Sequence, residues 1–274
     1  MAEFQFHDPG SSFHHLLISN TSALPAGARG VSDQTGLPER GSHEKKDLSQ
    51  WVPHGTTVLA LRYKEGVIMA GDRRATEGYA ISERRIEKVH KADATSAIAI
   101  AGAAGPCLEL TRLFQTELEH YEKLEGSELS MDGKANKLAQ MIKANLPMAM
   151  QGLVVVPIFS GYDLKRETGR IFKYDIAGGR YEETEYYAIG SGGKDARGTM
   201  KKIFKADLSR DKAIRVAVEA LYDAAEADVA TGGPDLIRGI FPNVKVISKK
   251  GVENVPQEQV QALLETMIQE LGGK

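Results

Sequence analysis

Thiols are scarce in this sequence, which has one cysteine, Cys107, among 274 residues. An internal disulfide needs two thiols and a thiolate metal site needs several, so we expect neither. This cysteine usage is typical of a reduced, intracellular compartment. Histidine offers no alternative set of ligands, because His14, His15, His43 and His54 precede the strand-like part of the sequence and no second cluster follows. We therefore expect no bound metal.

An excess of one charge, a long apolar run and a phosphate-binding glycine motif are also missing. The formal net charge is −2 and no basic stripe is present, which argues against nucleic acid as a partner. No segment reaches 18 uninterrupted apolar residues, and the N-terminus lacks the pattern of a signal peptide, so we expect neither a membrane span nor secretion. "IAGAAG" at 100–105 and "IGSGGKDARG" at 189–198 lack the spacing of nucleotide-binding loops. We expect a cytoplasmic protein without a cofactor.

The sequence has two parts that differ in amino-acid composition. Residues 1–55 are rich in Gly, Ser, His, Pro and charge, with too few apolar residues to build a core, and we interpret them as an appendage. Residues 56–274 are long enough for one large core. Short β-type runs at 57–63, 66–72, 79–93 and 95–102 come first. Two helices follow, one with Leu108, Leu113, Leu118, Tyr121 and Leu124 and ending at Gly126, the other with Leu138, Met141, Ile142 and Leu146.

The second half repeats this order of strands before helices. Runs at 153–163, 169–175 and 183–192 predict strands, and residues 194–206 predict a helix. A further helix, a hairpin at 244–255 and a last helix that begins after Pro256 complete the chain. The apolar stripes of these two helices are Ile214, Val218, Leu221, Tyr222 and Ala225, and Val260, Leu263, Leu264, Met267, Ile268 and Leu271. Grouped strands favour an α+β fold, a four-layer α/β/β/α sandwich with largely antiparallel sheets.

A paired threonine stands at the border between the two parts. Thr56 and Thr57 follow Gly55 directly and precede the first apolar strand. A threonine hydroxyl is a weak nucleophile without a base, and the free α-amine of the same residue, with a pKa of roughly 7.7–8.0, can be that base. Such an amine exists only if residues 1–55 are removed. Gly55, which has no Cβ, would let its carbonyl take the contorted approach that attack by Thr56 needs. Without other motifs, a loop that enters a strand would be the favoured interpretation of this pair.

Further motifs in a fixed order decide between these interpretations. "GTTVLAL", "VIMAGDRRATEG", "RRIEKVHK", "IAGAAG", "AIGSGG" and "DVATGGPD" run from Gly55 towards residue 250. Together they resemble the catalytic β-subunits of the proteasome, within the N-terminal-nucleophile hydrolases, and the segment "VAVEALYDAAEADVATGGPDLIRGIFP" resembles the actinobacterial type. The resemblance implies a propeptide over residues 1–55, cleaved autocatalytically between Gly55 and Thr56. Residues 56–274 would be the catalytic domain.

The resemblance assigns roles to individual residues. Thr56 matches the nucleophile, and Asp72 and Lys88 match the carboxylate and ammonium that flank it. A positive Lys88 would favour the neutral form of the Thr56 amine, because like charges repel each other, and Asp72 would hold Lys88 in place. Taken alone, Lys88 would be read as a surface charge.

Four more residues match the surroundings of the nucleophile. Ser191, Asp228 and Thr231 match the groups that orient its amine, although the family usually has serine where Thr231 stands; the hydroxyl is kept. Gly102 matches the residue whose backbone N–H faces the developing oxyanion.

A substrate pocket is also implied. Ala75, Ile86, Ile100 and Ala104 resemble the lining of the pocket for the side chain before the cleaved bond, and Thr76 resembles a residue that pairs with substrate backbone. Strand periodicity independently predicts that Ile86 and Lys88 share a face, and that Ile100 and Gly102 do. Large apolar residues before the cleaved bond are therefore expected.

Two other residues near these motifs carry reactive groups. Cys107, beside Pro106 at the start of a helix, is interpreted as a small packed residue, because no catalytic histidine can be placed near it. His90 stays open as a base.

The implied function is a threonine endopeptidase that works inside stacked seven-membered rings. Implied partners are proteasome α-subunits, identical β-subunits, a regulatory ring ATPase and proteins tagged with a prokaryotic ubiquitin-like protein. Two alternatives are a structural ring subunit without catalysis and an amidase for small molecules. Intact Thr56, Asp72 and Lys88 argue against the structural subunit.

Overall fold

The computed structural model describes residues 55–77 and 80–272. All of them belong to Lys46–Lys274, the second of the two units into which the chain divides. Apart from Gly55, the predicted propeptide lies outside the described residues.

Two antiparallel sheets form the centre of this unit. The first has five strands in the order β10 (Tyr186–Gly190), β1 (Thr57–Tyr63), β2 (Gly66–Gly71), β11 (Asn243–Ser248) and β12 (Gly251–Asn254). The second has the order β5 (Val89–Lys91), β6 (Ser96–Gly102), β7 (Val155–Asp163), β8 (Thr168–Tyr174) and β9 (Arg180–Glu183). A small hairpin pairs β3 (Ala75–Glu77) with β4 (Ala80–Glu83).

The sheets pack face to face, and their inner faces share one apolar core. Along β1, Val58 and Ala60 point into this core, whereas Leu59 and Leu61 point to the opposite face, where helices cover the sheet. Side chains alternate along a strand, so a strand that is buried on both faces reads as a continuous apolar run. This explains why residues 57–63 show no polar alternation.

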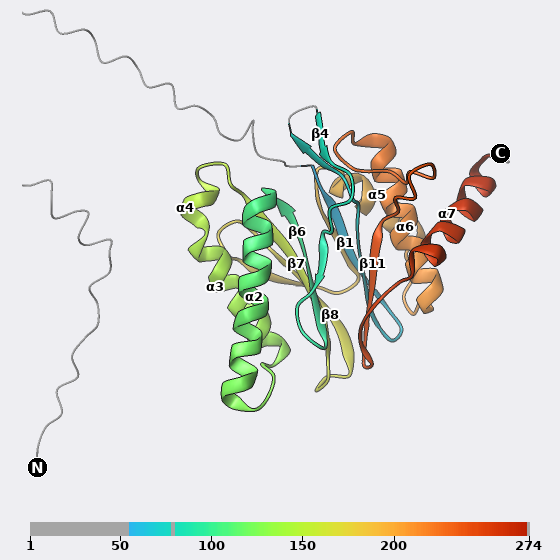
Figure 1. Ribbon diagram of the computed structural model, residues 1–274. Helices are drawn as coiled ribbons and strands as arrows, with labels where there is room; N and C mark the ends of the chain where they lie inside the picture. Colours follow the sequence, from blue (N-terminus) through green and yellow to red (C-terminus); the bar gives the residue numbers. More distant parts are fainter. Residues whose placement is uncertain (1–54, 78–79, 273–274) are drawn as a thin grey trace, which may run out of the picture. The chain divides into compact units, whose positions relative to one another are not determined.

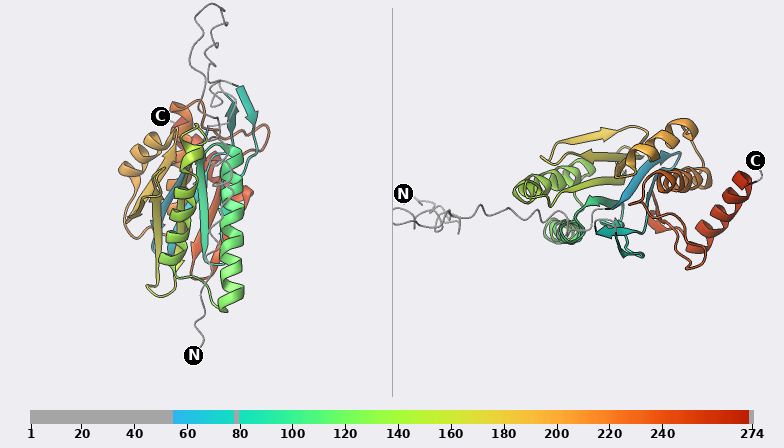
Figure 2. Two further views of the ribbon diagram at one scale, coloured as in Figure 1. Left: turned by 90° about the vertical axis from the view of Figure 1, so that its left-hand side faces the viewer. Right: turned by 90° about the horizontal axis from the view of Figure 1, so that it is seen from above.

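Helices cover both outer faces (Figures 1 and 2). On the second sheet lie α2 (Ala104–Glu125) and α3 (Met131–Ala144), followed by the short α4 (Leu146–Ala149). On the first sheet lie α5 (Gly193–Ile203) and α6 (Arg210–Ala227), and α7 (Gln257–Gly272) packs beside α6. The predicted four-layer α/β/β/α sandwich is thus confirmed. None of the described helices combines the length and apolarity needed to span a bilayer.

The segment 79–93 differs from its prediction as one strand. β4 ends at Glu83 and β5 begins at Val89, and the residues between them are irregular. The Glu83 carboxylate accepts the next two backbone N–H groups, at 2.7 and 2.9 Å, and so turns the chain. The Arg73 guanidinium donates to the carbonyls of Arg85 and Ile86, at 2.9 and 3.0 Å. Ile86 and Lys88 precede β5, so the predicted strand is wrong at these residues, although both side chains line one cavity as expected.

Helix α2 forms as predicted and ends at Gly126 in the left-handed conformation, but its buried face differs from the predicted stripe. Leu113, Tyr121 and Leu124 are exposed. The buried positions follow the 3.6-residue period from a different start. They are Cys107, Leu110, Thr111, Phe114 and Leu118.

Candidate active site

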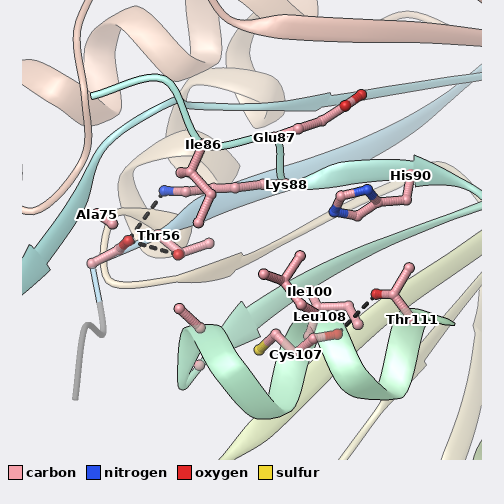
Figure 3. A pocket seen from close by; sticks show the side chains of 13 residues that line it. Thr56, Ala75, Ile86, Glu87, Lys88, His90, Ile100, Cys107, Leu108 and Thr111 are labelled. Carbon is pink, nitrogen blue, oxygen red and sulfur yellow. Dashed lines mark hydrogen bonds between the residues drawn. The ribbon is translucent and has the colours of Figure 1, made fainter. Parts of the chain in front are cut away.

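Thr56 lies directly before β1, at the end of the first sheet that also carries the C-terminal end of β2 (Figure 3). Its side chain is buried, and its hydroxyl donates to the carbonyl oxygen of Gly55 at 2.6 Å. Gly55 has no room for a side chain, because a Cβ there would lie 2.4 Å from Thr76 Oγ1 and 2.8 Å from the carbonyl oxygen of Ala230. Only glycine therefore lets this carbonyl reach the Thr56 hydroxyl without displacing its neighbours.

Asp72 follows the last residue of β2 and is completely buried. Its Oδ1 accepts the Lys88 ammonium at 2.6 Å and the Thr57 backbone N–H at 2.7 Å. Its Oδ2 accepts the backbone N–H groups of Gly232 and Arg74, at 2.8 and 2.9 Å. Four donors thus hold the buried carboxylate, as a buried charge requires.

Lys88 is 5% exposed and has an oxygen acceptor for each of its three protons. Besides Asp72, its Nζ donates to the carbonyls of Arg74 at 2.5 Å and Gly55 at 3.1 Å. Burial lowers the pKa of Lys88, and the Asp72 carboxylate opposes this by favouring the charged form. The Lys88 ammonium and the Thr56 hydroxyl thus both donate to the carbonyl oxygen of Gly55.

Asp228, at the C-terminal end of α6, forms a second carboxylate centre. Its Oδ2 accepts the hydroxyls of Ser191 and Thr231, each at 2.5 Å. Ser191 also reaches the Thr56 carbonyl, through its backbone N–H at 3.0 Å and more weakly through its hydroxyl at 3.4 Å. Burial raises the pKa of Asp228, but the hydroxyl donors outweigh it and the net shift is downward. The structure thus brings Ser191, Asp228 and Thr231 together beside Thr56.

A small cavity that is open to solvent lies next to Thr56 and Lys88 (Figure 3). The predicted pocket residues Ala75, Ile86, Ile100 and Ala104 all line it, and so does Gly102 at the end of β6. Thr76 is not part of the lining, because its hydroxyl lies against Gly55.

The comparisons with known proteins agree with this geometry. The family described as "Proteasome subunit" matches residues 52–237. A protein named "Proteasome subunit beta" from Acidimicrobium ferrooxidans is 51% identical over 98% of this chain and 94% of its own length. Proteins with the same name from Frankia casuarinae and Acidothermus cellulolyticus are 51% and 50% identical over 96% of this chain, and over 92% and 88% of their own lengths. The chain belongs to the proteasome subunit family.

In this proteasome subunit, Thr57 is a site residue that the sequence analysis missed. Its hydroxyl accepts the Gly192 N–H at 3.0 Å and lies 2.7 Å from the Thr231 hydroxyl. The Thr231 hydroxyl in turn donates to Asp228. Since the Thr57 backbone N–H also donates to Asp72, this one residue connects both carboxylate centres. The feature of the sequence that could have pointed to Thr57 is its position directly after Thr56.

The cavity of this proteasome subunit has lining residues that were not predicted: Glu87, His90, Cys107, Leu108 and Thr111. Glu87 is a carboxylate at an exposed position, paired with Lys245 at 2.9 Å. Burial raises the pKa of the Cys107 thiol to about 12, so the thiol stays protonated and is a poor nucleophile. Burial also lowers the pKa of His90. Within the described residues, no group of three or more His, Cys, Asp or Glu side chains is arranged to hold a metal ion.

Proposed function

We propose that this chain is the precursor of a threonine endopeptidase subunit of the proteasome core, and that it cleaves itself between Gly55 and Thr56. The observation that carries the proposal is the convergence on the Gly55 carbonyl. The Thr56 hydroxyl contacts its oxygen at 2.6 Å from one side, and the Lys88 ammonium contacts it at 3.1 Å. A nucleophile and a cation thus meet at the bond that must break.

Self-cleavage would begin with attack of Thr56 Oγ1 on the carbonyl carbon of Gly55. The hydroxyl turns from the oxygen to the carbon, and the negative charge that develops on the oxygen is stabilised by Lys88. The Gly55–Thr56 C–N bond then breaks, the nitrogen takes up the hydroxyl proton, and an ester between Gly55 and Thr56 Oγ1 results. Water hydrolyses this ester, which releases residues 1–55 and leaves Thr56 with a free hydroxyl and a free amine.

Substrate cleavage would repeat the attack with the new amine as the base. The α-amine takes the hydroxyl proton, Lys88 favours the neutral amine by repulsion, and Asp72 positions Lys88. Ser191 and Asp228 would orient the amine, and the Gly102 N–H would stabilise the oxyanion. Thr76, in β3, would pair with substrate backbone.

Apolar side chains before the cleaved bond would enter the cavity beside Thr56, since Ala75, Ile86, Ile100 and Ala104 form its walls. Glu87 also lines the cavity, but its carboxylate is exposed and paired with Lys245. It would therefore attract a basic substrate side chain less than an unpaired carboxylate would.

Assembly completes the proposal. Relatives named "Proteasome subunit beta" support a place in a proteasome core. The proposal adds rings of identical β-subunits that stack with proteasome α-subunits in the cytoplasm. A regulatory ring ATPase and substrates tagged with a prokaryotic ubiquitin-like protein belong to the same proposal. The exposed apolar side chains Leu113, Leu124, Met150 and Ile237 suit a chain that buries surface on assembly.

The test uses the full chain and Thr56→Ala, each produced with an α-subunit. We expect the assembled wild-type protein to begin at Thr56, to react with a covalent threonine-directed probe, and to cleave fluorogenic peptides faster after Leu or Tyr than after Arg. Thr56→Ala should keep residues 1–55 and cleave nothing. Peptidase activity in an uncleaved chain would refute the mechanism. Ring assembly without probe labelling would indicate a structural subunit, and a labelled monomer would indicate an amidase.

A further inference from the structure

His90 lines the cavity beside Thr56, at the end away from Thr56 (Figure 3). On β5 it pairs with Ile98 of β6, and its neighbour Val89 points into the core between the sheets. Side chains alternate along a strand, so His90 points to the opposite face, which α2 covers. Its imidazole lies on the side of the cavity that Thr111 of α2 also lines (Figure 3).

The cavity combines apolar walls with titratable groups, and one of these, Lys88, lies beside Thr56. Its titratable lining groups are Glu87, Lys88, His90 and Cys107. Lys88 is bound to Asp72, the Cys107 thiol has a pKa of about 12, and Glu87 is paired with Lys245. Imidazole is the side chain whose ordinary pKa lies between pH 5 and 8. His90 is therefore the lining group best suited to change its charge in that range.

Charged groups from several elements surround the imidazole. Glu87 precedes it on the same segment; its carboxylate charge and its backbone carbonyl, which accepts a hydrogen bond from the imidazole, both favour the imidazolium. Lys245 on β11 and Arg112 on α2 disfavour it, and Lys88 adds a further positive charge at the cavity wall. Burial is the largest influence, and it lowers the pKa of His90 below its ordinary value. The imidazole therefore takes up its proton at a lower pH than an ordinary histidine does.

We propose that His90 is a specificity-determining residue that makes the cavity accept carboxylate side chains when its imidazole is protonated. This rests on the proposed peptidase function and concerns the residue before the cleaved bond. With neutral His90 the cavity takes apolar side chains. With the imidazolium, a substrate Asp or Glu side chain finds an ion-pair partner at His90, the lining cation that has no carboxylate of the protein within ion-pair distance among the described residues.

The experiment compares two peptides that differ only in Glu or Gln before the cleaved bond, with the processed, assembled protein. Both peptides share the catalytic steps, so titration of the Thr56 amine cancels in the Glu/Gln ratio of kcat/KM. A glutamate side chain, with an ordinary pKa of about 4.3, is still mostly ionised at pH 5.0. We expect the ratio to rise at least about fivefold from pH 7.5 to pH 5.0, because an ion pair forms in a poorly solvated site.

Two variants assign the rise to a residue. His90→Gln keeps a polar side chain without a titration in this range and should leave the ratio flat. Glu87→Gln should keep a rise but move it to lower pH, because the Glu87 charge favours the imidazolium. A companion pair with Lys or Gln before the cleaved bond should show the opposite trend in the wild-type protein, which tests the charge without any substitution.

The outcomes separate the two proposals. A flat Glu/Gln ratio in active wild-type protein, or a rise that persists in His90→Gln, would overturn the role of His90 and leave the peptidase function standing. Absence of any peptide cleavage and of threonine labelling would overturn both.

Discussion

Asp72 and Lys88 form a buried ion pair whose two members should differ in their importance for stability. The pair is 2.6 Å long, and its side chains are 0% and 4% exposed. Without Lys88, the Asp72 carboxylate keeps three backbone N–H donors, from Thr57, Arg74 and Gly232. In Asp72→Asn, by contrast, the Lys88 ammonium keeps only neutral oxygen acceptors. We therefore expect Asp72→Asn to cost more than Lys88→Met.

The magnitude follows from these partners. Breaking a buried pair by removing one partner costs about 3–5 kcal/mol. In Asp72→Asn the new NH2 group must also face two N–H donors, which adds roughly 1–3 kcal/mol for each donor left unpaired. In Lys88→Met the remaining carboxylate stays solvated by its three amides, and the side chain keeps its length in a tightly packed place. The free energy of unfolding should therefore fall by at least about 2 kcal/mol more in Asp72→Asn.

Urea unfolding measures this difference. Both substitutions are placed in a Thr56→Ala chain, so that every variant keeps the Gly55–Thr56 bond and the same covalent length, and native mass spectrometry checks that all share one assembly state. With an m-value of about 3 kcal/mol/M, a difference of about 2 kcal/mol moves the midpoint by roughly 0.7 M. An equal or larger loss in Lys88→Met would show that the backbone amides do not hold the Asp72 charge.

The same pair predicts the effect on processing. In a chain with intact Thr56, we expect Lys88→Ala and Lys88→Arg both to assemble, to keep residues 1–55 largely uncleaved and to lose peptidase activity by several orders of magnitude. Arginine retains the charge but places a wide planar group where a compact ammonium meets three oxygens. Normal processing of Lys88→Ala, seen by N-terminal sequencing, would remove Lys88 from the mechanism.

Two further predictions concern Thr57 and Cys107. Thr57→Val, which removes only the hydroxyl function, should lower kcat about tenfold or more and shift its pH profile, because the Gly192 N–H and the Thr231 hydroxyl lose their partner beside Asp228; Thr57→Ser should restore both, and an unchanged pH profile in Thr57→Val would contradict this. The single thiol, Cys107, should react slowly with iodoacetamide at pH 8 in the native protein and rapidly in denaturant, because its pKa rises from 9.0 to about 12 on burial; fast native labelling would refute that burial.

The layers of the fold were predictable because apolar patterns report burial directly. Strand β1 is buried on both faces and reads as an unbroken apolar run, and α6 and α7 show their buried stripes at helical spacing. Segment 79–93 failed because its backbone groups between β4 and β5 are satisfied by side chains, chiefly Arg73, instead of a strand ladder. Periodicity carries no record of such long-range donors. The predicted stripe of α2 was wrong because it included Leu113 and Leu124, which are exposed. Apolar residues on the surface contribute to a helical pattern in the same way as buried ones.

The site was less accessible to reasoning from residue patterns alone. Asp72 and Lys88 are 16 positions apart, and no spacing rule brings them together; only the resemblance to a family did so. The structure supplies the physical reason, which is that the chain after the β3–β4 hairpin passes the end of β2 before it enters β5. Thr57 was missed because its partners, Gly192 and Thr231, come from two distant loops.

The glycines of "IGSGG" allow a close backbone contact and do not form a phosphate-binding loop. The motif lacks the spacing of a phosphate-binding loop, yet its glycines are needed. Gly190 has φ of 97°, and a Cβ there would lie 1.9 Å from the carbonyl oxygen of Thr56. A Cβ at Gly192 would lie within 2.7 Å of the Thr57 and Thr231 hydroxyls. Because the loop has no side chains at these positions, its backbone can approach the threonine pair closely enough to bind the Thr56 carbonyl and the Thr57 hydroxyl. A loop that resembles an anion cradle therefore serves to fix the residue that we propose as the nucleophile.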